Sequence, residues 1–246
     1  MDRQNRSIAR YAIFPFQAVW LVVSATVYGA ACMITGMFSK QLSQTIGKLW
    51  SRQLLRFLGV KITVTGKEKL APRVSYVFFA NHQSALDIPV CFAGLSQPLC
   101  FIAKKELFMI PFFGWGMSGM GHVKIDRTNA RKARESLRIG VNRLASWRFS
   151  LVLFPEGTRS PTGELGEFKQ GSFSLALEAG LTAGAVVVPI AICKANERLP
   201  KKSLFINPGP VYIEICDPVD LRGMDKVRLA AEVRGEIEKA LGLHKT

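Results

Sequence analysis

Residues 74–89, VSYVFFANHQSALDIP, decide how the rest of this 246-residue chain is interpreted. They open with an apolar run, Val74 to Ala80, that is typical of a buried strand and leads into an apolar helix. His82 and Asp87 cannot share one face of an uninterrupted helix, because five steps of 100° leave them about 140° apart. The helix must therefore begin between them.

Ser84 is the expected N-cap of this helix, with Asp87 three residues later at a capping-box spacing. Pro89 is tolerated only within a first turn. His82 then lies in the loop between strand and helix, and Asp87 reaches back towards its ring. A neutral histidine oriented by a carboxylate is the arrangement of a general base. The same spacing also occurs by chance, so a capped loop without a catalytic role is the alternative.

Composition narrows the class of partner. The formal net charge of +15 favours an anionic partner, which is nucleic acid, a phospholipid surface or a phosphorylated substrate. Hydrophobic residues make up 48% of the chain, a high share for a soluble domain. The five cysteines show neither paired spacing nor a C-x-x-C motif, which favours a reducing compartment.

Residues 1–59 are predicted to attach the chain to a membrane. No charged residue occurs from Tyr11 to Ser39, and the apolar run Phe14 to Phe38 is long enough to cross a bilayer. A cleaved signal peptide is the alternative, but its apolar core would be far shorter. Because basic residues flank the run on both sides, we expect a hairpin-like anchor that enters and leaves by the same face.

A second helix is predicted over residues 41–58, where apolar side chains recur at helical spacing. Lys48, Arg52 and Arg56 follow one another at intervals of four and form a basic stripe. This pattern predicts a basic amphipathic helix on the membrane surface. An ordinary core helix with a solvated stripe is the alternative.

Residues 60–246 are predicted to form one α/β domain, because strands alternate with helices as they do around a mainly parallel sheet. Pro189 predicts an edge or a bulge in its strand. The glycine-rich run 110–116 predicts a lipid-facing wall or core, and residues 196–202 an exposed turn. The expected strands are 61–66, 74–80, 98–103, 123–127, 150–154, 185–192 and 211–215. The expected helices after the one that follows His82 are 129–147, 168–179 and 225–241.

Four blocks follow one another between residues 60 and 220. They are Asn81–Asp87 (NHQSALD), KKEL from Lys104 with IPFFGW from Ile110, Phe154–Ser160 (FPEGTRS), and Val187–Ile190 (VVPI). This combination resembles the bacterial 1-acylglycerol-3-phosphate acyltransferases, and the N-terminal segment resembles that family's two-helix membrane motif. The resemblance implies a glycerolipid acyltransferase-like fold. It also implies transfer of a fatty acyl group from a thioester carrier to the sn-2 hydroxyl of lysophosphatidic acid, which gives phosphatidic acid.

The resemblance assigns roles to individual residues. His82 matches the general base, and Asp87 would fix its tautomer and stabilise the imidazolium. Lys105 and Arg159 match phosphate-contacting positions, since a phosphate monoester requires fixed cations.

Other residues of the blocks are binding candidates. Gly157 and Thr158 lie in a turn whose backbone N–H groups could face the substrate. Glu156 either holds that turn or binds the glycerol hydroxyls. Lys104 and Arg127 are weaker basic candidates.

The residue types present and their spacing argue against a metal-dependent mechanism and against a covalent acyl-enzyme. The three histidines, at 82, 122 and 244, form no metal-ligand spacing, and we expect neither a metal nor a cofactor. No cysteine or G-x-S-x-G serine is placed as a nucleophile, which favours direct transfer over an acyl-enzyme.

Two kinds of alternative remain. The acceptor could be glycerol 3-phosphate, another lysophospholipid or a lipid A precursor. A basic membrane-binding or nucleic-acid-binding protein without catalysis would also fit the charge alone. The motif blocks weigh against the latter, so we expect no nucleic-acid partner. We expect acyl carrier protein or acyl-CoA as donor, and an inner-membrane location with the catalytic domain on the cytoplasmic face.

Overall fold

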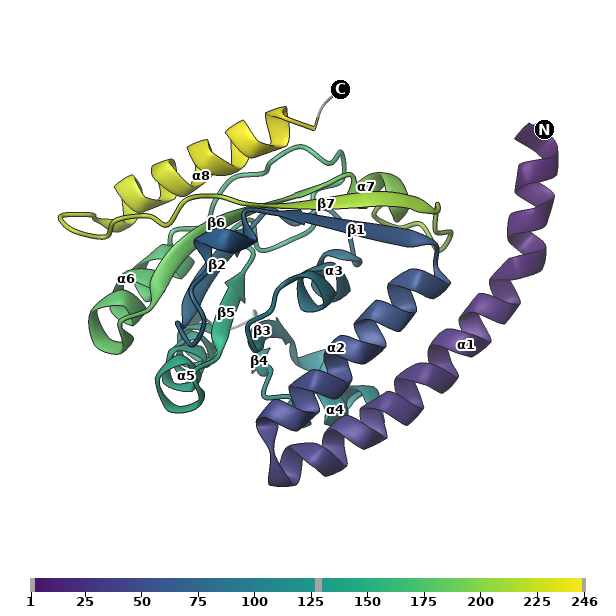
Figure 1. Cartoon of the computed structure of the whole chain (residues 1–246), viewed down its shortest axis with the longest axis horizontal. Helices are drawn as coiled ribbons and strands as arrows, with labels where there is room; N and C mark the ends of the chain where they lie inside the picture. Colours follow the sequence, from purple (N-terminus) through teal and green to yellow (C-terminus); the bar gives the residue numbers. More distant parts are fainter. Residues whose placement is uncertain (1–2, 127–129, 245–246) are drawn as a thin grey trace.

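The computed structural model describes residues 3–126 and 130–244 (Figure 1). Its centre is a seven-stranded sheet with the order β1-β7-β6-β2-β5-β3-β4. Neighbouring strands are parallel except β6 and β7, so the predicted mainly parallel α/β sheet is confirmed. The strands are β1 Val60–Thr65, β2 Tyr76–Ala80, β3 Leu99–Lys104, β4 Val123–Ile125, β5 Ser150–Leu153, β6 Val186–Cys193 and β7 Gly209–Ile215.

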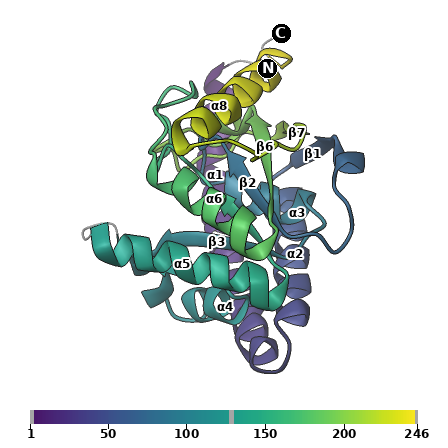
Figure 2. The same ribbon diagram turned by 90° about the vertical axis from the view of Figure 1, so that its left-hand side faces the viewer.

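Helices cover both faces of the sheet (Figure 2). They are α1 Arg3–Phe38, α2 Lys40–Phe57, α3 Asp87–Gly94, α4 Phe113–Gly119, α5 Ala130–Trp147, α6 Gly171–Ala183, α7 Ala195–Arg198 and α8 Lys226–Gly242, with short 3-10 helices η1 Lys67–Lys69 and η2 Lys105–Met109. Strand β2 is apolar throughout because both of its faces are buried. Val77 and Phe79 enter the core beneath α5, α6 and α8, whereas Phe78 and Ala80 enter the core shared with α2 and α3. A strand covered on both faces has no polar side.

Of the two alternatives predicted for Pro189, the edge is wrong, because β6 lies between β7 and β2. The antiparallel register shifts by one residue beside it, from Ile190 opposite Ile215 to Val187 opposite Val219, as it does at a bulge. Strand β7 ends at Ile215, and the Pro189 carbonyl accepts the N–H of Cys216 at 3.0 Å. The N–H and C=O of one strand residue point to the same side, so the proline nitrogen faces the place where the β7 ladder stops. The missing donor therefore interrupts no pairing within the ladder.

The helix expected from Phe168 begins later, at Gly171. The N–H of Lys169 is bonded to the Pro155 carbonyl at 2.9 Å, so this segment first packs back on the loop after β5. The helix then continues past the expected end at Ala179 and stops where Gly184 adopts a left-handed conformation with φ of 60°.

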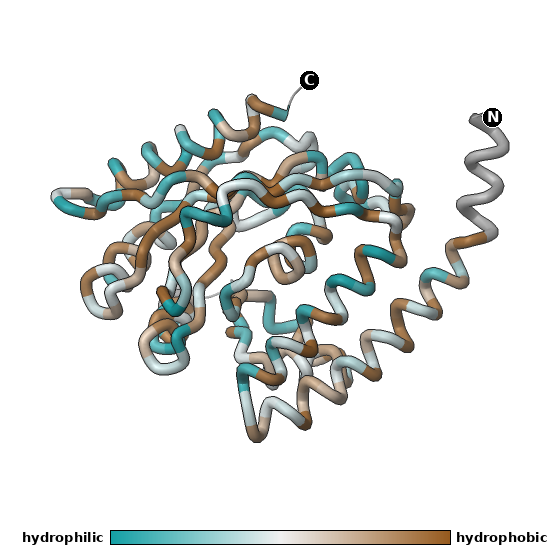
Figure 3. Tube along the Cα trace, in the orientation of Figure 1, coloured by the Kyte–Doolittle hydropathy of each residue, from teal (hydrophilic) through white to brown (hydrophobic). Residues whose placement is uncertain are grey.

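Helix α1 is long and apolar enough to cross a membrane over Ile13–Phe38, by length and composition, and only 11% of its most apolar window is buried. It lies beside α2 and α4 (Figures 1 and 3). A Cβ added at Gly29 would lie 2.5 Å from the Phe112 carbonyl oxygen, so glycine lets the backbones of α1 and α4 touch. Large apolar side chains on the outer surface of α1 are exposed, namely Ile13, Phe16, Val19, Leu21, Val22, Val23, Val27, Ile34, Met37 and Phe38.

Helix α2 is confirmed, and of its basic stripe Arg52 and Arg56 are exposed as predicted, whereas Lys48 is partly buried. The ammonium of Lys48 donates to the carbonyls of Leu95, Ser96 and Gln97 at 3.0, 2.6 and 2.7 Å, just beyond the end of α3. Arg52 donates to Ala93 at 3.4 Å. Cations are favourable at a helix C-terminus, where unpaired carbonyls gather. Helix α2 therefore packs one side on the domain, while Arg52, Arg56, Leu42 and Leu49 remain exposed on the other.

Candidate active site

Four neighbouring parallel strands, β2, β5, β3 and β4, present polar side chains at their carboxyl ends, and the blocks that begin at Asn81, Lys104 and Phe154 follow the first three of them. The loop with His82 follows β2, and the loop with Glu156 to Arg159 follows β5. Lys105 follows β3 and Asp126 follows β4. In open α/β sheets, ligands bind outside the carboxyl ends of the strands, so the fold gathers these side chains where a substrate site is expected.

His82 and Asp87 are in direct contact. The His82 Nδ1 lies 2.7 Å from Asp87 Oδ2, and the same oxygen accepts the N–H groups of Gln83 and Ser84 at 2.7 and 2.8 Å. The Asp87 side chain is fully buried. An oxygen that receives two backbone donors is held as a carboxylate acceptor, so the third donor is Nδ1–H. This tautomer leaves the Nε2 lone pair of His82 free to take a proton.

The His82 ring is fixed from a second direction. It stacks on Phe154 with ring centroids 4.2 Å apart and an interplanar angle of 22°. Its side chain stays 17% exposed, so a substrate can reach it. Asp87 Oδ1 is buried without a partner among the described residues. A positive charge on the ring of His82 would be stabilised by this adjacent carboxylate.

The helix after His82 begins at Asp87, two residues later than the predicted N-cap Ser84 would place it. The Ser84 hydroxyl instead accepts Leu86 N–H at 3.2 Å and donates to the Leu199 carbonyl at 2.8 Å. Asp87 still receives the Ser84 N–H, as in a capping box, and Pro89 does lie in the first turn. The turn closed by the Ser84 hydroxyl therefore takes the place of the first helical turn that an N-cap at Ser84 would have started.

Glu156 ties the loops together. Its Oε1 accepts the His82 N–H at 2.6 Å, and its Oε2 accepts the Gly166 N–H at 3.0 Å. Burial raises the pKa of this carboxyl above its usual value, although the two N–H groups lower it. Nearby, the Ser160 N–H donates to the His82 carbonyl at 2.8 Å. Both carboxylate oxygens thus face backbone, which favours the turn-holding role over binding of glycerol hydroxyls.

The basic candidates have different surroundings. Lys105 is 44% exposed in its side chain and pairs with Asp126 at 2.7 Å, a contact that raises the pKa of its ammonium. Arg159 is partly buried in the loop after β5, directly before Ser160. Lys104 is exposed at the end of β3, and Arg127 lies outside the described residues. Strand β5, which leads to Arg159, lies between β3, which leads to Lys105, and β2, which leads to His82.

The turn between Glu156 and Arg159 has the conformation its sequence suggests. Gly157 has a φ of 71°, which favours glycine, and Thr158 is exposed.

Sequence reasoning missed several supports of the site. The Asn81 side chain bonds both the N–H and the carbonyl of Ile192, at 2.7 and 2.9 Å, and fixes the histidine loop to β6. Residues 196–202 were expected to be an exposed turn, yet Lys201 is partly buried and donates to the Arg159 carbonyl at 2.6 Å. The only signal in the sequence was a pair of lysines, which does not show which one turns inward.

His122 has no catalytic surroundings. It is buried between the rings of Phe92 and Phe101, at 5.6 and 5.5 Å, and burial together with Arg143 lowers its pKa to about 3. In the described part of the chain, no three His, Cys, Asp or Glu side chains gather as a metal site would require.

Comparisons with known proteins identify the family of the chain. The sequence model of the family described as Acyltransferase matches residues 61–193. A 1-acyl-sn-glycerol-3-phosphate acyltransferase of Salmonella typhimurium is 30% identical over 237 residues, which cover 95% of this chain and 92% of that protein. The chloroplastic 1-acyl-sn-glycerol-3-phosphate acyltransferase of Arabidopsis thaliana is 31% identical over 99% of this chain, which spans 66% of the plant protein.

A solved structure shares the fold. The crystal structure of the 1-acyl-sn-glycerophosphate acyltransferase PlsC from Thermotoga maritima superposes with a TM-score of 0.85 at 24% identity, covering 98% of both chains.

Proposed function

The chain belongs to the acyltransferase family, and from this premise we propose how its side chains carry out transfer to a lysophospholipid. It is a 1-acyl-sn-glycerol-3-phosphate acyltransferase, an enzyme that esterifies lysophosphatidic acid to phosphatidic acid. The roles of individual residues, the donor and the attachment to the membrane are our proposals.

His82 is the general base of the transfer. Its Nε2 removes the proton of the acceptor's sn-2 hydroxyl while that oxygen attacks the thioester carbonyl carbon. A C–O bond forms, the C–S bond then breaks, and the departing thiolate takes the proton from the imidazolium. The observation that carries this proposal is the 2.7 Å contact between Nδ1 and the buried Asp87, which orients the ring and stabilises its positive charge.

Transfer is direct, without an acyl-enzyme. The five cysteines are free and buried. Burial raises the pKa of Cys91, the thiol on the same helix as Asp87, well above its usual value. A buried protonated thiol is a poor nucleophile. The acyl group therefore passes from donor to acceptor while both are bound.

Arg159 is proposed to bind the acceptor's phosphate, with Lys105 and Lys104 nearer the rim. A guanidinium can hold two phosphate oxygens at once. Lys105 is already paired with Asp126, which reduces the net charge it offers. We therefore expect Arg159 to contribute more than Lys105 to acceptor binding. The donor is an acyl thioester of acyl carrier protein or coenzyme A.

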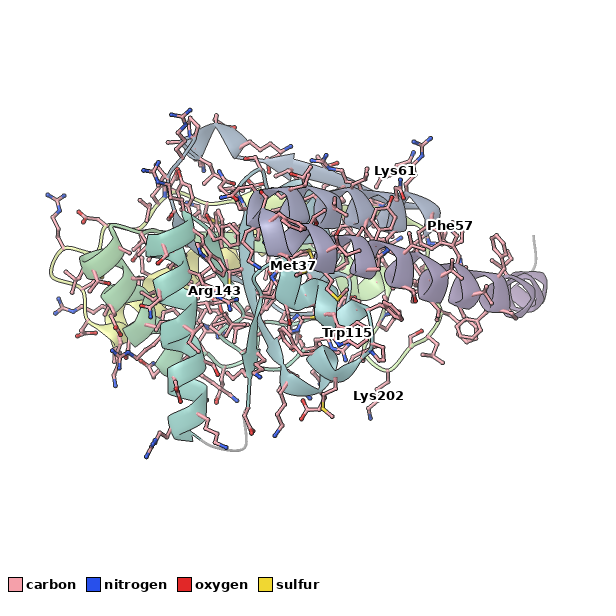
Figure 4. All side chains as sticks on the ribbon, turned by 90° about the horizontal axis from the view of Figure 1, so that it is seen from below. Met37, Phe57, Lys61, Trp115, Arg143 and Lys202 are labelled. Carbon is pink, nitrogen blue, oxygen red and sulfur yellow. The ribbon has the colours of Figure 1, made fainter. Side chains whose placement is uncertain are left out.

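Residues 1–59 are proposed as the membrane-attaching unit and residues 60–246 as the acyltransferase domain. The exposed apolar side chains of α1 adjoin those of the segment before and within α4, where Met109, Ile110 and Trp115 are also exposed. Figure 4 shows Met37 and Trp115 on the face that α1 occupies. A lipid acceptor could then reach the domain without leaving the membrane. We place the domain on the cytoplasmic face of the inner membrane.

The test is acceptor-dependent release of free thiol by purified protein in a nonionic detergent. With an acyl thioester as donor, release is expected only when lysophosphatidic acid is present. Glycerol 3-phosphate, a lysophosphodiester and a lipid A precursor serve as competing acceptors. Faster release with one of these would reassign the acceptor, and release without any acceptor would point to a thioesterase.

A further inference from the structure

Lys201 lies against the loop that carries Arg159. Its Nζ donates to the Arg159 carbonyl at 2.6 Å, and its side chain is partly buried. Two residues earlier, the Leu199 carbonyl accepts the Ser84 hydroxyl at 2.8 Å. Segment 199–201 therefore follows the edge of both loops of the site, the one with His82 and the one with Arg159.

The basic side chains near this edge differ in whether an acidic partner compensates their charge. Lys105 is neutralised by Asp126 at 2.7 Å, whereas neither Arg159 nor Lys201 has an acidic partner within 4.0 Å in the described ranges. An ammonium carries three N–H donors, and the Arg159 carbonyl occupies one. Two donors of Lys201 remain for a ligand next to the Arg159 loop.

The acceptor's charge suits this pair. A phosphate monoester has a second pKa of about 6, so it carries nearly two negative charges at neutral pH. One guanidinium balances only one of them. A second cation that is fixed by the backbone and has no acidic partner of its own would balance the other.

We propose that Lys201 is the second cation of the acceptor's phosphate site and that it favours the dianionic phosphate monoester. This inference rests on the proposed function, because it assumes that Arg159 receives the phosphate. The bond to the Arg159 carbonyl fixes the position of the ammonium, and the two remaining N–H donors bind a phosphate oxygen.

The neighbouring Lys202 supplies a matched control. It is exposed, and Figure 4 shows it at the rim of the molecule. Lys201→Met and Lys202→Met remove the same charge one residue apart. In nonionic detergent micelles, Lys201→Met should raise the KM for lysophosphatidic acid about 10- to 100-fold, the range of a lost charge-assisted hydrogen bond, with the donor KM unchanged. Lys202→Met should match the wild type, and Lys201→Arg should recover most of the loss.

The pH dependence separates phosphate binding from mere support of the loop. The ratio of the Lys201→Met KM to the wild-type KM should grow between about pH 5.5 and pH 8, as the phosphate gains its second charge. His82 and Glu156 also face this site, but both are present in both enzymes and cancel in the ratio.

Three results have distinct meanings. A ratio that is large but constant with pH would show that Lys201 only supports the Arg159 loop, and the inference would be wrong. Equal behaviour of Lys201→Met and Lys202→Met would contradict it as well. Wild-type protein that fails to acylate lysophosphatidic acid would instead refute the proposed function itself.

Discussion

Glu156 holds the backbone of His82: its Oε1 accepts the His82 N–H at 2.6 Å while its Oε2 accepts Gly166 N–H at 3.0 Å. A carboxylate that could have served the substrate is thus occupied on both oxygens. The loop after β5 sets the position of the base, although that base comes from the loop after β2.

Glu156→Gln should therefore impair turnover more than binding. The amide keeps one acceptor oxygen and presents an NH₂ group to the other N–H, so either His82 or Gly166 loses its partner. We expect kcat to fall on the order of tenfold or more, because small displacements of a catalytic group are costly, with little change in acceptor KM. Glu167→Gln, an exposed change one residue beyond Gly166, is the control. An increase in acceptor KM at constant kcat would instead assign Glu156 to the glycerol hydroxyls.

Close packing of α1 on α4 predicts that Gly29→Ala destabilises the protein. The new Cβ would lie 2.5 Å from the Phe112 carbonyl oxygen, so the helices must separate. Gly235→Ala in α8 is the matched control, since its Cβ meets nothing within 4 Å and should stabilise the helix by about 0.5–1 kcal/mol. Thermal unfolding in detergent should move down for the first and slightly up for the second. Equal upward shifts would show that α1 does not pack on α4 in this way.

Local patterns predicted the parts of the site that lie close in sequence. The apolar strand β2, the loop position of His82 and its contact with Asp87 all follow from residues 74–89. Alternation of strands and helices was enough for the mainly parallel sheet. These features depend on periodicity and on the reach of one side chain, which the sequence shows directly.

Features that depend on distant elements were missed or misread. Of the edge or bulge expected at Pro189, the edge is wrong, because strand order is set by chain crossovers and places β6 inside the sheet. Lys48 has the spacing of a surface position, and only the end of α3 reveals that its ammonium binds backbone carbonyls. Lys201 contacts a loop 42 residues away. Contacts between residues so far apart in the chain produce no local sequence pattern from which they could be predicted.

Buried His122 predicts a specific loss of stability in acid. Its pKa is about 3 in the folded protein against about 6.5 in the unfolded chain, so between these values the unfolded state binds a proton that the folded state does not. The free energy of unfolding should fall as pH drops from about 6.5 towards 3, by up to about 1.4 kcal/mol per pH unit from this group.

His122→Phe removes that titration, whatever its effect on absolute stability. Denaturant unfolding in detergent from about pH 7 to pH 4 should give a shallower pH slope for the variant. An identical slope in both proteins would show that His122 takes up its proton in the folded state.

Attachment to the membrane should resist salt. The exposed surface of α1 is apolar, and apolar burial is not screened as charge is. We expect the full chain to stay in the membrane fraction through a high-salt wash and to require detergent for release. Release by salt alone would show that the basic surface, and not α1, provides the attachment.

The histidine and aspartate should behave as one unit. His82→Ala removes the base, and Asp87→Asn leaves an amide that can face the ring with its NH₂ group and favour the wrong tautomer. Both variants should be severely impaired, and the double variant should be little worse than His82→Ala, because the second change has no function left to remove. Losses that multiply would indicate independent roles.

The most direct test is acceptor-dependent thiol release by His82→Ala, with circular dichroism to verify that the variant is folded. With lysophosphatidic acid and an acyl thioester both saturating, turnover should fall by at least about 10²-fold relative to wild type, the lower end of the contribution of general base catalysis. A folded His82→Ala protein with near-normal turnover would contradict the mechanism.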